Sequence, residues 1–465
     1  MNSDAVLIFT PIDYKYKDAD THYAPSLGLV ALENYLYSNG KMIDILDGSI
    51  VYNQNEILAY ITKYKPEFVG QSIQLISYEN SLEIAEAVRS YGGINIIGGH
   101  HASQMYEAIL INQHHLIDYI IIGDGEEGWL KLLNSDNIES IPNIAYYKDG
   151  KVCCTYNKPF DINLLPIDYS RADLKPYQKR LKESVFSDHK YDNYLRIYSH
   201  KGCGNRLNSN ACVFCGRADQ GVRFKSAELY WEDIKQCAME GLTTYIFDVG
   251  DDLLFSEKWI DEVIACKPKI SQTYELGVFG RANRVNHKMA EKLRKLSVVD
   301  VVIGFESGDE EVMRRCNKLD STPAQNILAA EYLAANGIDV TASYVLGLPG
   351  DNETSLKNTV KNATKVYEII YSELGRAPKE MVANLIEPSP GSPAYKEILK
   401  RFPEKYYQKD ILSLEELQRD YFRCFFNLES AKEYNDFRKM LGKYANEIHS
   451  LVDFADSQGW LNEEL

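Results

Sequence analysis

The sequence predicts an α/β protein with a doubly wound N-terminal domain, a partial (βα)6 barrel and a helical C-terminal region. Residues 4–133 alternate five short apolar runs with helix-compatible stretches, and a larger alternation of the same kind resumes at Leu195. The region from Leu412 onward is charged and helix-rich and carries no recognisable motif. With 465 residues, 45% of them hydrophobic, the chain can bury the cores of two or three domains.

Five continuous apolar runs predict the strands of the N-terminal domain, and glycines mark the turns between them. The predicted strands are Ala5–Thr10, Met42–Leu46, Phe68–Ile73, Asn95–Ile97 and Tyr119–Ile122. The predicted helices between them are Ser26–Ser38, Asn55–Tyr64, Tyr78–Tyr91 and Ala102–Ile111. Strands that are apolar on both faces indicate a parallel sheet covered by helices on both sides. Ligands of such domains bind beyond the carboxyl ends of the strands.

Residues 134–190 interrupt this alternation. Two short runs, Ile141–Tyr147 and Lys151–Tyr156, flank the turn residues Lys148–Gly150, a pattern typical of a β-hairpin. Irregular sequence with two prolines follows the second run. We interpret the segment as a linker that contains a hairpin.

Six βα units predict the second domain. The predicted strands are Leu195–Ser199, Thr244–Asp248, Leu276–Phe279, Val301–Phe305, Val340–Leu346 and Met381–Ile386. The predicted helices are Ala227–Met239, Lys258–Ala265, Lys288–Leu296, Pro323–Asn336 and Thr354–Ile369. Six units indicate an incomplete barrel, and active sites of barrels lie at the carboxyl ends of their strands. The predicted domain limits are 1–133, 134–190, 191–390 and 391–465.

Charge and apolar content narrow the class of protein. The formal net charge of −16 argues against a nucleic-acid-binding protein, which usually presents a basic face. No segment approaches the roughly 20 uninterrupted apolar residues that span a bilayer, and Met1–Ile12 lacks the pattern of a signal peptide. We therefore expect a cytoplasmic protein without a membrane or nucleic-acid partner.

The cysteines fall into two groups. Their number, nine, is odd, and a disulfide framework is not expected in a long chain without an export signal. Six of them show no pattern, and we expect these to be small buried apolar residues: Cys153, Cys154, Cys237, Cys266, Cys316 and Cys424. The other three are clustered.

Cys203, Cys212 and Cys215 follow the first predicted strand of the second domain, where a barrel carries its chemistry. Three thiolates on one loop can ligate three irons of a [4Fe–4S] cluster, which leaves the fourth iron open to a small molecule. The nearby glycines 202, 204 and 216 would let the backbone approach the sulfurs. A structural zinc site with His200 as fourth ligand fits the spacing of the last two cysteines equally well. The position at a strand end favours the cluster.

At these residues the chain resembles the radical SAM superfamily, whose members usually carry C-x3-C-x2-C on the loop after the first barrel strand. The last two cysteines fit that pattern, and Phe214 stands just before Cys215. The first gap departs from it, because eight residues, Gly204–Ala211, replace three. A longer loop can still bring its ends together at small entropic cost.

Further segments of residues 195–390 support the resemblance. Val345–Gly350 resembles the Gly-rich segment of the fifth strand, against which the adenine of S-adenosylmethionine (SAM) packs, and Ile303–Gly308 resembles the "GxES" stretch of the fourth strand. The resemblance implies a SAM site near Glu306, Ser307, Arg281, Gly347 and Gly350. The Gly-Gly-Glu segment that is frequent after the second strand is absent, which leaves the contact to the SAM amino group unassigned.

Residues 1–133 resemble the cobalamin-binding domain that precedes many radical SAM domains. The matching segments are Ala24–Gly28, Asp44–Gly48, Ile97–Ala102 and Asp118–Glu126. The resemblance implies that a corrinoid tail lies near Gly98 and Gly99 and accepts hydrogen bonds from Ser72 and Ser77.

The cobalamin signature D-x-H-x-x-G is absent, because Pro25 occupies the glycine position that would follow Asp20 and His22. We expect His100 and His101 to shape the turn after the fourth strand, and cobalt to be bound without a histidine of the protein. A domain that has lost cobalamin and serves as a substrate platform or dimer surface is the alternative.

The resemblance implies an enzyme that cleaves SAM reductively at a [4Fe–4S] cluster. With cobalamin, the expected reaction is methylation of an unactivated carbon of a small-molecule or peptide substrate, with electrons from a donor such as flavodoxin or ferredoxin. The alternatives are a non-methylating rearrangement, cyclisation or dehydration, and a non-catalytic zinc-stabilised corrinoid or nucleotide-binding protein. Methylthiolation of RNA is not expected, because a second cysteine triad and a basic domain are missing.

Overall fold

The computed structural model describes residues 3–12, 23–183, 191–209, 211–219, 221–318 and 321–452. These residues fall into two compact units. The first lies within Met1–Leu195, Gly216–Gln220 and Leu399–Leu414. The second lies within Arg196–Cys215, Gly221–Ile398 and Glu415–Leu465. Among the described residues, no helix combines the length and apolar character needed to cross a bilayer.

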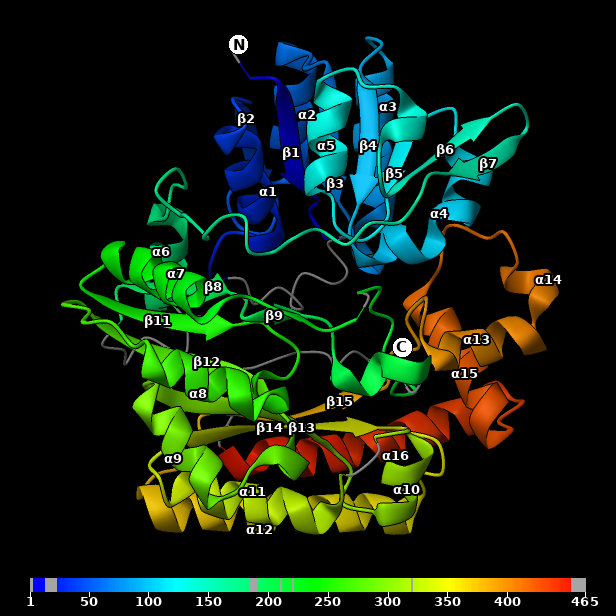
Figure 1. The fold of residues 1–465 in the computed structure, drawn as a ribbon. Coiled ribbons are helices and arrows are strands. Elements are labelled where there is room, and N and C mark those ends of the chain that lie inside the picture. The colour runs from blue at the N-terminus through cyan, green and yellow to red at the C-terminus, as the bar shows by residue number, and fades with distance from the viewer. Residues whose placement is uncertain are drawn as a thin grey trace. The chain divides into compact units, whose positions relative to one another are not determined.

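The first unit is built on a seven-stranded sheet with the order β2-β1-β3-β4-β5-β6-β7 (Figure 1). Its five parallel strands confirm the predicted doubly wound domain: β1 Ala5–Phe9, β2 Ile43–Asp47, β3 Phe68–Ser72, β4 Ile94–Gly98 and β5 Tyr119–Ile121. Its helices are α1 Leu27–Ser38, α2 Gln54–Tyr64, α3 Tyr78–Arg89, α4 His100–Gln113, α5 Glu126–Leu133 and α6 Lys175–Glu183. Short 3-10 helices lie at Leu75–Ser77 and Ile138–Ser140.

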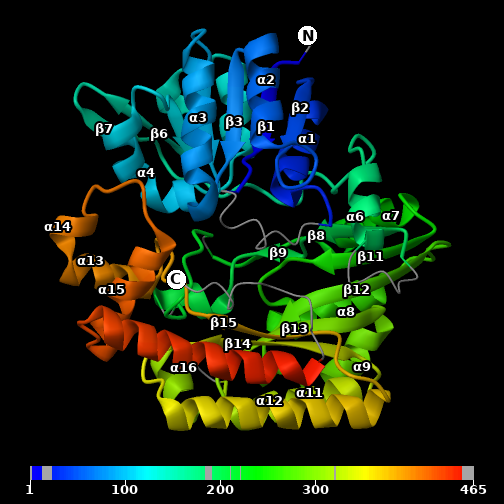
Figure 2. The same cartoon turned by 180° about the vertical axis from the view of Figure 1, so that it is seen from behind.

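Alternate residues of β1 pack into two separate cores, one on each face of the sheet. Leu7 of β1 faces α1 and α5, where it packs with Leu36 and Trp129. The neighbouring Ile8 faces the opposite side, where it packs with Ile57 of α2 and with residues of α3. The view from behind shows α2 and α3 on that side of the sheet (Figure 2). Both faces of the sheet are therefore buried, which explains why the strands are apolar throughout.

The predicted hairpin is part of this sheet. Strands β6 Ile144–Lys148 and β7 Lys151–Cys154 pair antiparallel with each other, and β6 pairs antiparallel with β5. The segment that we interpreted as a linker therefore extends the N-terminal sheet by two strands. The edge position of β7 also explains why Cys153 and Cys154 are not buried as predicted. Cys266 and Cys424 are partly exposed as well, and only Cys237 and Cys316 match that prediction.

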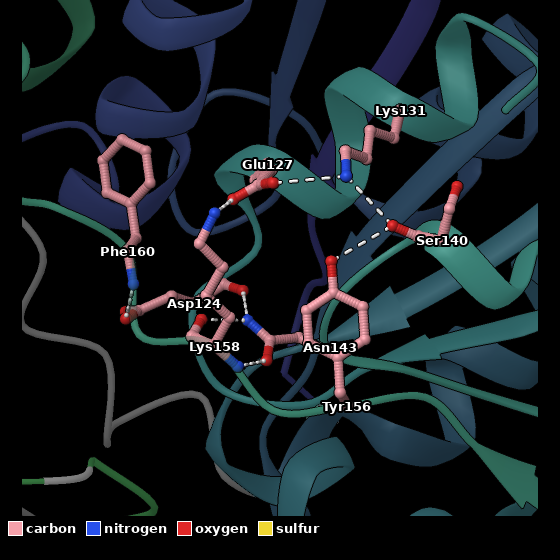
Figure 3. Close-up of polar contacts among 8 residues, drawn as sticks. All are labelled: Asp124, Glu127, Lys131, Ser140, Asn143, Tyr156, Lys158 and Phe160. Atoms are coloured by element: carbon pink, nitrogen blue, oxygen red, sulfur yellow. Dashed lines mark hydrogen bonds and ion pairs between the residues drawn. The ribbon is translucent and has the colours of Figure 1, made fainter.

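Asn143 fixes the chain on both sides of the hairpin (Figure 3). It is buried and has a left-handed backbone with φ of 62°. Its amide donates to the carbonyl oxygens of Asp124 and Lys158 at 2.9 and 2.8 Å, and its Oδ1 accepts from the Lys158 nitrogen at 2.8 Å. Glu127 adds an ion pair to Lys158 at 2.6 Å. The polar network therefore holds the irregular segment after the hairpin against the turn that precedes α5.

The second unit contains a curled, open sheet of six strands in the order β15-β14-β13-β12-β11-β8. All six predicted strands are present: β8 Asn193–Ile197, β11 Thr243–Asp248, β12 Thr273–Gly280, β13 Val298–Glu306, β14 Asp339–Leu346 and β15 Met381–Leu385. The pairs from β11 to β15 are parallel, so their carboxyl ends lie at one edge. This arrangement confirms the predicted partial barrel.

Helices cover the outer face of this sheet (Figure 1). They are α7 Ala227–Met239, α8 Glu257–Ala265, α9 His287–Lys295, α10 Glu310–Arg315, α11 Pro323–Ala334 and α12 Glu353–Leu374. The short helix α10 was not predicted. Short 3-10 helices lie at Gly204–Ser209, Leu253–Phe255, Ala282–Arg284 and Ser450–Val452.

The helical C-terminal region is divided between the two units. Its helices are α13 Pro393–Arg401, α14 Pro403–Tyr406, α15 Leu414–Phe426 and α16 Ala431–His449. Asp410 joins the first unit, where its carboxylate accepts from Tyr78 at 3.1 Å and from Gln113 at 2.8 Å. Helix α16 packs along β15 and α12 in the second unit (Figure 2). Both units therefore depend on residues that follow the last strand.

We expect Asn143→Ala to lower the free energy of unfolding by about 4 kcal/mol, from three hydrogen bonds of about 1 kcal/mol each and about 1 kcal/mol of left-handed strain. Asn143→Gly keeps the backbone conformation, so it should lose only about 3 kcal/mol. Denaturant unfolding measures both. Asn137→Ala, which removes the side-chain cap of an exposed 3-10 helix, is the control. A loss for Asn143→Ala no larger than that of the control would contradict the role of this network.

The buried carboxyl of Asp300 gives a second prediction. Burial raises its pKa from 3.8 to about 6, although it accepts hydrogen bonds from Tyr245 at 3.1 Å and Thr341 at 3.3 Å. Because the fold favours the neutral form, this contribution to stability is complete below pH 4 and is lost as the pH rises to 6. Asp300→Asn should therefore gain about 3 kcal/mol relative to wild type between pH 4 and 7. Unfolding measured across that range, with exposed Glu331→Gln as control, tests this; parallel pH profiles would contradict it.

Candidate functional site

The cysteine loop leaves the sheet at the end of β8 and is closed at its base. The short strands β9 His200–Lys201 and β10 Arg223–Phe224 pair antiparallel at this base. Gly202 has φ of 92°, and a Cβ there would lie 1.8 Å from the carbonyl oxygen of Gly221. A Cβ at Gly204 would lie 2.0 Å from the Phe255 ring. These glycines therefore make room for backbone and an aromatic ring at the base of the loop.

His200 supports this base as a neutral, buried residue. Its Nε2 accepts from the backbone nitrogen of Asp252 at 3.1 Å, and its Nδ1 lies 2.8 Å from the Ser199 hydroxyl. The ring stacks on Phe224, and burial lowers the pKa of the imidazole. Both ring nitrogens are thus engaged, so the zinc alternative with His200 as a ligand does not fit this structure. The described part of the chain also holds no three His, Cys, Asp or Glu side chains placed around a single metal ion.

The three thiols of the loop are free and partly exposed. The Asn205 amide donates to the sulfur of Cys212 at 3.1 Å, and the Arg206 guanidinium donates to the sulfur of Cys215 at 3.6 Å. Burial raises the pKa of the Cys212 thiol to about 11, so a bound metal is needed to hold it as thiolate at neutral pH. A [4Fe–4S] cluster takes one thiolate per iron, and N–H donors commonly surround its sulfurs. The residues present therefore fit such a cluster.

Glu306 and Lys318 form a buried ion pair at the end of β13. The Lys318 ammonium lies 2.5 Å from Oε1 of Glu306 and 2.5 Å from the carbonyl oxygen of Gly304. Glu306 has φ of 59°, and a Cβ at Gly304 would lie 2.3 Å from its carboxylate. The charges of this pair and of Arg281 act on the Cys212 thiol. The structure therefore brings Glu306, Arg281 and Cys212, three of the predicted site residues, within electrostatic reach of one another.

Two further predicted residues, Arg281 and Ser307, contact neighbouring hydroxyl groups. Arg281 is buried after β12 and donates to the Ser321 hydroxyl at 3.5 Å. The Ser307 hydroxyl lies 3.2 Å from that of Thr359 and accepts from the Asp309 nitrogen at 3.1 Å. Ser307 thereby fastens the turn after β13 to α12.

Gly347 and Gly350 form the turn after β14, with φ of 87° and 95°. A Cβ at Gly347 would lie 3.0 Å from the Phe422 ring, and the Gly347 carbonyl accepts from Tyr421 at 3.0 Å. The buried Asp351 carboxylate accepts from the Gly347 nitrogen at 2.9 Å. The C-terminal helices and Asp351 thus shape this turn. Neither the contact with these helices nor the role of Asp351 is predicted from the sequence. Asp351 stands next to Gly350 in the chain, which is the only signal that could have found it.

In the first unit, Ser72, Gly98 and Gly99 lie together at the carboxyl ends of β3 and β4. The nitrogen of Ile73 donates to the Gly98 carbonyl at 3.0 Å. Gly99 has φ of 98°, and a Cβ there would lie 2.9 Å from the Ile73 carbonyl oxygen and 3.5 Å from the Ser72 hydroxyl. The structure thus brings these three predicted residues to one edge. Ser77 is buried nearby in the chain and bonds to the backbone of Gln74 instead.

His100 and His101 differ sharply. His100 is exposed at the start of α4, whereas His101 is buried against the Tyr78 ring. Burial lowers the pKa of His101 to about 4, and neither ring nitrogen has a hydrogen-bond partner among the described residues. A buried, neutral imidazole without a partner is a place for a bound group or water, so the edge fits a cofactor. Asp20 and His22 lie outside the described residues.

Comparisons with known proteins identify both parts of the chain. The model of the radical SAM superfamily matches residues 197–363, and the model of the B12 binding domain matches residues 20–133. The anaerobic magnesium-protoporphyrin IX monomethyl ester cyclase of Rubrivivax gelatinosus is 24% identical over 73% of this chain and 62% of its own. The hopanoid C-3 methylase of Methylococcus capsulatus is 24% identical over 70% of this chain and 62% of its own. The chain thus spans about three-fifths of each relative.

Among solved structures, the cobalamin-dependent SAM radical enzyme OxsB, with aqua-cobalamin and SAM bound, superposes with a TM-score of 0.67. The match covers 96% of this chain and 71% of OxsB at 13% identity, and it shows the same fold. A radical SAM domain implies a [4Fe–4S] cluster and SAM as cofactors, and a B12-binding domain implies cobalamin. The chain belongs to those members of the radical SAM superfamily that also carry a B12-binding domain.

Proposed function

We propose that this radical SAM enzyme holds its [4Fe–4S] cluster on Cys203, Cys212 and Cys215 and methylates an unactivated carbon of a small-molecule or peptide substrate with cobalamin. The cluster assignment rests on the three free thiols of the loop after β8. The sulfurs of two of them accept hydrogen bonds from side-chain N–H groups. When bound, the cluster, SAM and cobalamin supply the electron and methyl-group chemistry. The chain itself positions these groups and keeps water away.

We propose that SAM binds at the carboxyl ends of β13 and β14. The buried Glu306–Lys318 pair acts electrostatically on the Cys212 thiol, so it would offer both charge signs close to a cluster ligand. At the neighbouring strand end, Gly347 and Gly350 form a turn without side chains, in which Gly347 is buried and Gly350 is partly exposed. A SAM molecule carries a carboxylate and an ammonium group, which such a paired site can orient. Ser307 and Arg281 support this edge through their contacts to Thr359 and Ser321.

We propose that cobalamin binds at the edge formed by Ser72, Gly98 and Gly99 without a histidine ligand. Small residues at these strand ends leave room for a ligand in a doubly wound domain. His100 is exposed at the helix start, and the D-x-H-x-x-G pattern is missing. The buried His101 is the remaining candidate ligand, and the second experiment below tests it.

The matched relatives support methylation and ring closure to a similar degree, because the hopanoid methylase and the cyclase match nearly the same share of the chain. A non-methylating cyclisation is therefore the second candidate. Either reaction needs an external one-electron donor, and we propose a flavodoxin or ferredoxin. A reduced cluster and unpaired cysteines suit the reducing cytoplasm.

For the cluster, each of Cys203, Cys212 and Cys215 is changed to Ala and reconstituted anaerobically with iron and sulfide. We expect every variant to lose the full complement of four irons, because each thiolate binds a different iron. Iron and acid-labile sulfide are counted, together with the cluster absorption. Cys424→Ala, a partly exposed cysteine outside the loop, is the matched control and should retain the cluster. A complete cluster with SAM cleavage in Cys203→Ala would show that the first ligand is misassigned.

For cobalamin, the protein is loaded with hydroxocobalamin and freed from unbound cofactor. Its absorption is recorded, and the bound cofactor is then reduced to paramagnetic cob(II)alamin for electron paramagnetic resonance. We expect retained cobalamin without nitrogen splitting from a protein ligand, and identical spectra for His100→Gln and His101→Gln. Methylation should then form S-adenosylhomocysteine from SAM only in cobalamin-loaded protein. Absence of retained cobalamin would favour the non-methylating alternative. Nitrogen splitting that His101→Gln removes would instead identify His101 as a ligand.

A further inference from the structure

The long first gap of the cysteine motif is folded and is not a passive spacer. Cys203 and Cys212 are separated by eight residues, and the first six of these form the 3-10 helix Gly204–Ser209. The helix begins directly after the first cysteine, where the Arg206 nitrogen donates to the Cys203 carbonyl at 3.0 Å. Its second and third residues, Asn205 and Arg206, therefore have fixed positions close to the thiols.

The amide of Asn205 connects a sulfur to a distant part of the second unit. Its Nδ2 donates to the Cys212 sulfur at 3.1 Å and to the carbonyl oxygen of Asn317 at 3.1 Å. The side chain of Asn317 in turn donates to the Ala211 carbonyl at 2.9 Å. Because both ends of the insert are tied to Asn317, the amide of Asn205 is held in one orientation toward the sulfur.

Arg206 places a positive charge at the other sulfur. One guanidinium nitrogen donates to the Cys215 sulfur at 3.6 Å, and another lies 2.7 Å from the Asp251 carboxylate. The side chains of Arg206 and Asp251 are only 12% and 13% exposed, so water screens the pair weakly. The charge near Cys215 is therefore fixed in place and partly balanced by Asp251.

We propose that this insert sets the reduction potential of the cluster, with Asn205 and Arg206 raising it and Asp251 limiting the rise. The inference rests on the proposed function, because it requires Cys212 and Cys215 to ligate the cluster. Reduction adds one negative charge to the cluster and its thiolates. Hydrogen bonds and a nearby positive charge stabilise that added charge, which raises the potential, whereas a nearby carboxylate opposes it.

A gap of only three residues cannot hold a complete 3-10 helix of this length. The extended gap adds residues beyond Asn205 and Arg206, among them Ala211, whose carbonyl oxygen accepts from Asn317, the residue that also holds the Asn205 amide. The chain gains a site where the potential can be adjusted without moving a cysteine.

The test measures the midpoint potential of the reconstituted enzyme without SAM, by titration followed with electron paramagnetic resonance. Arg206→Met removes charge and donor at similar volume, and it also leaves Asp251 unbalanced. We expect its potential to become more negative by about 59 mV, a tenfold change in the one-electron equilibrium. Asn205→Leu should shift the potential in the same direction by a smaller amount. Arg206→Lys keeps the positive charge, so its potential should lie between those of the wild type and Arg206→Met.

Asp251→Asn provides the decisive comparison, because it leaves Arg206 unbalanced and should shift the potential upward. A merely structural disturbance of the loop would move Arg206→Met and Asp251→Asn in the same direction. Leu207→Met, in the same 3-10 helix and 39% exposed, is the control and should leave the potential unchanged. Equal potentials in all variants, or shifts of one sign for Arg206→Met and Asp251→Asn, would overturn the proposal.

The iron content of each variant separates this proposal from the cluster assignment. A full cluster that survives loss of Cys212 or Cys215 contradicts the proposed function, whereas a full cluster at unchanged potential contradicts only the tuning role. If Arg206→Met assembles no cluster, Arg206→Gln, which keeps a donor and loses the charge, is measured in the same way. Failure of every Arg206 variant to assemble would show a role in assembly and would overturn the proposal.

Discussion

The closed base of the cysteine loop is the constraint on which the rest of the site depends. A long loop would sample many conformations if only its two ends were fixed. Here the ribbon of β9 and β10, the buried His200 and the close approach at Gly202 hold the loop where β8 ends. The thiols are consequently presented at the edge of the sheet where β13 and β14 also end. Substituting any larger residue at Gly202 would open this base, because its Cβ has no space.

Charge is balanced in pairs around the thiols. Lys318 neutralises Glu306 and Asp251 accompanies Arg206, and all four side chains are less than 15% exposed. Removing both charges of such a pair from water is unfavourable, and their mutual attraction offsets that penalty only in good geometry. These buried pairs lower the stability of the fold, and they lie at the edge where a cluster and a charged cofactor are expected. An isolated carboxylate or lysine ammonium at the same depth would shift toward its neutral form.

The sequence predicted the strands well and the side-chain contacts poorly, for a physical reason. Apolar runs such as Val340–Leu346 reflect burial on both faces of a parallel sheet. Such a run is visible in a short stretch of sequence without knowledge of the fold. By contrast, the pairing of β6 with β5 and the use of Asp410 by the first unit involve residues far apart in the chain. The hydrogen-bond donors to the sulfurs also depend on distant residues. The orientation of the Asn205 amide is fixed by its contact with Asn317, which lies 112 positions later in the chain. The glycine motif was placed correctly after β14, but its packing against Phe422 required the structure.

The C-terminal region completes both units, and this shapes how the site can vary among similar chains. Tyr421 and Phe422 press on the turn of Gly347, so the position of that turn is set by α15 as much as by β14. Asp410, only eleven positions earlier, is held by Tyr78 and Gln113 in the first unit. A substitution in this region therefore reaches the proposed SAM edge through packing and the first unit through hydrogen bonds. The cysteine loop is joined to the C-terminal region and to the proposed SAM edge, because the nitrogen of Ala394 donates to the Val213 carbonyl at 2.9 Å and the charges of Glu306 and Lys318 act on the Cys212 thiol.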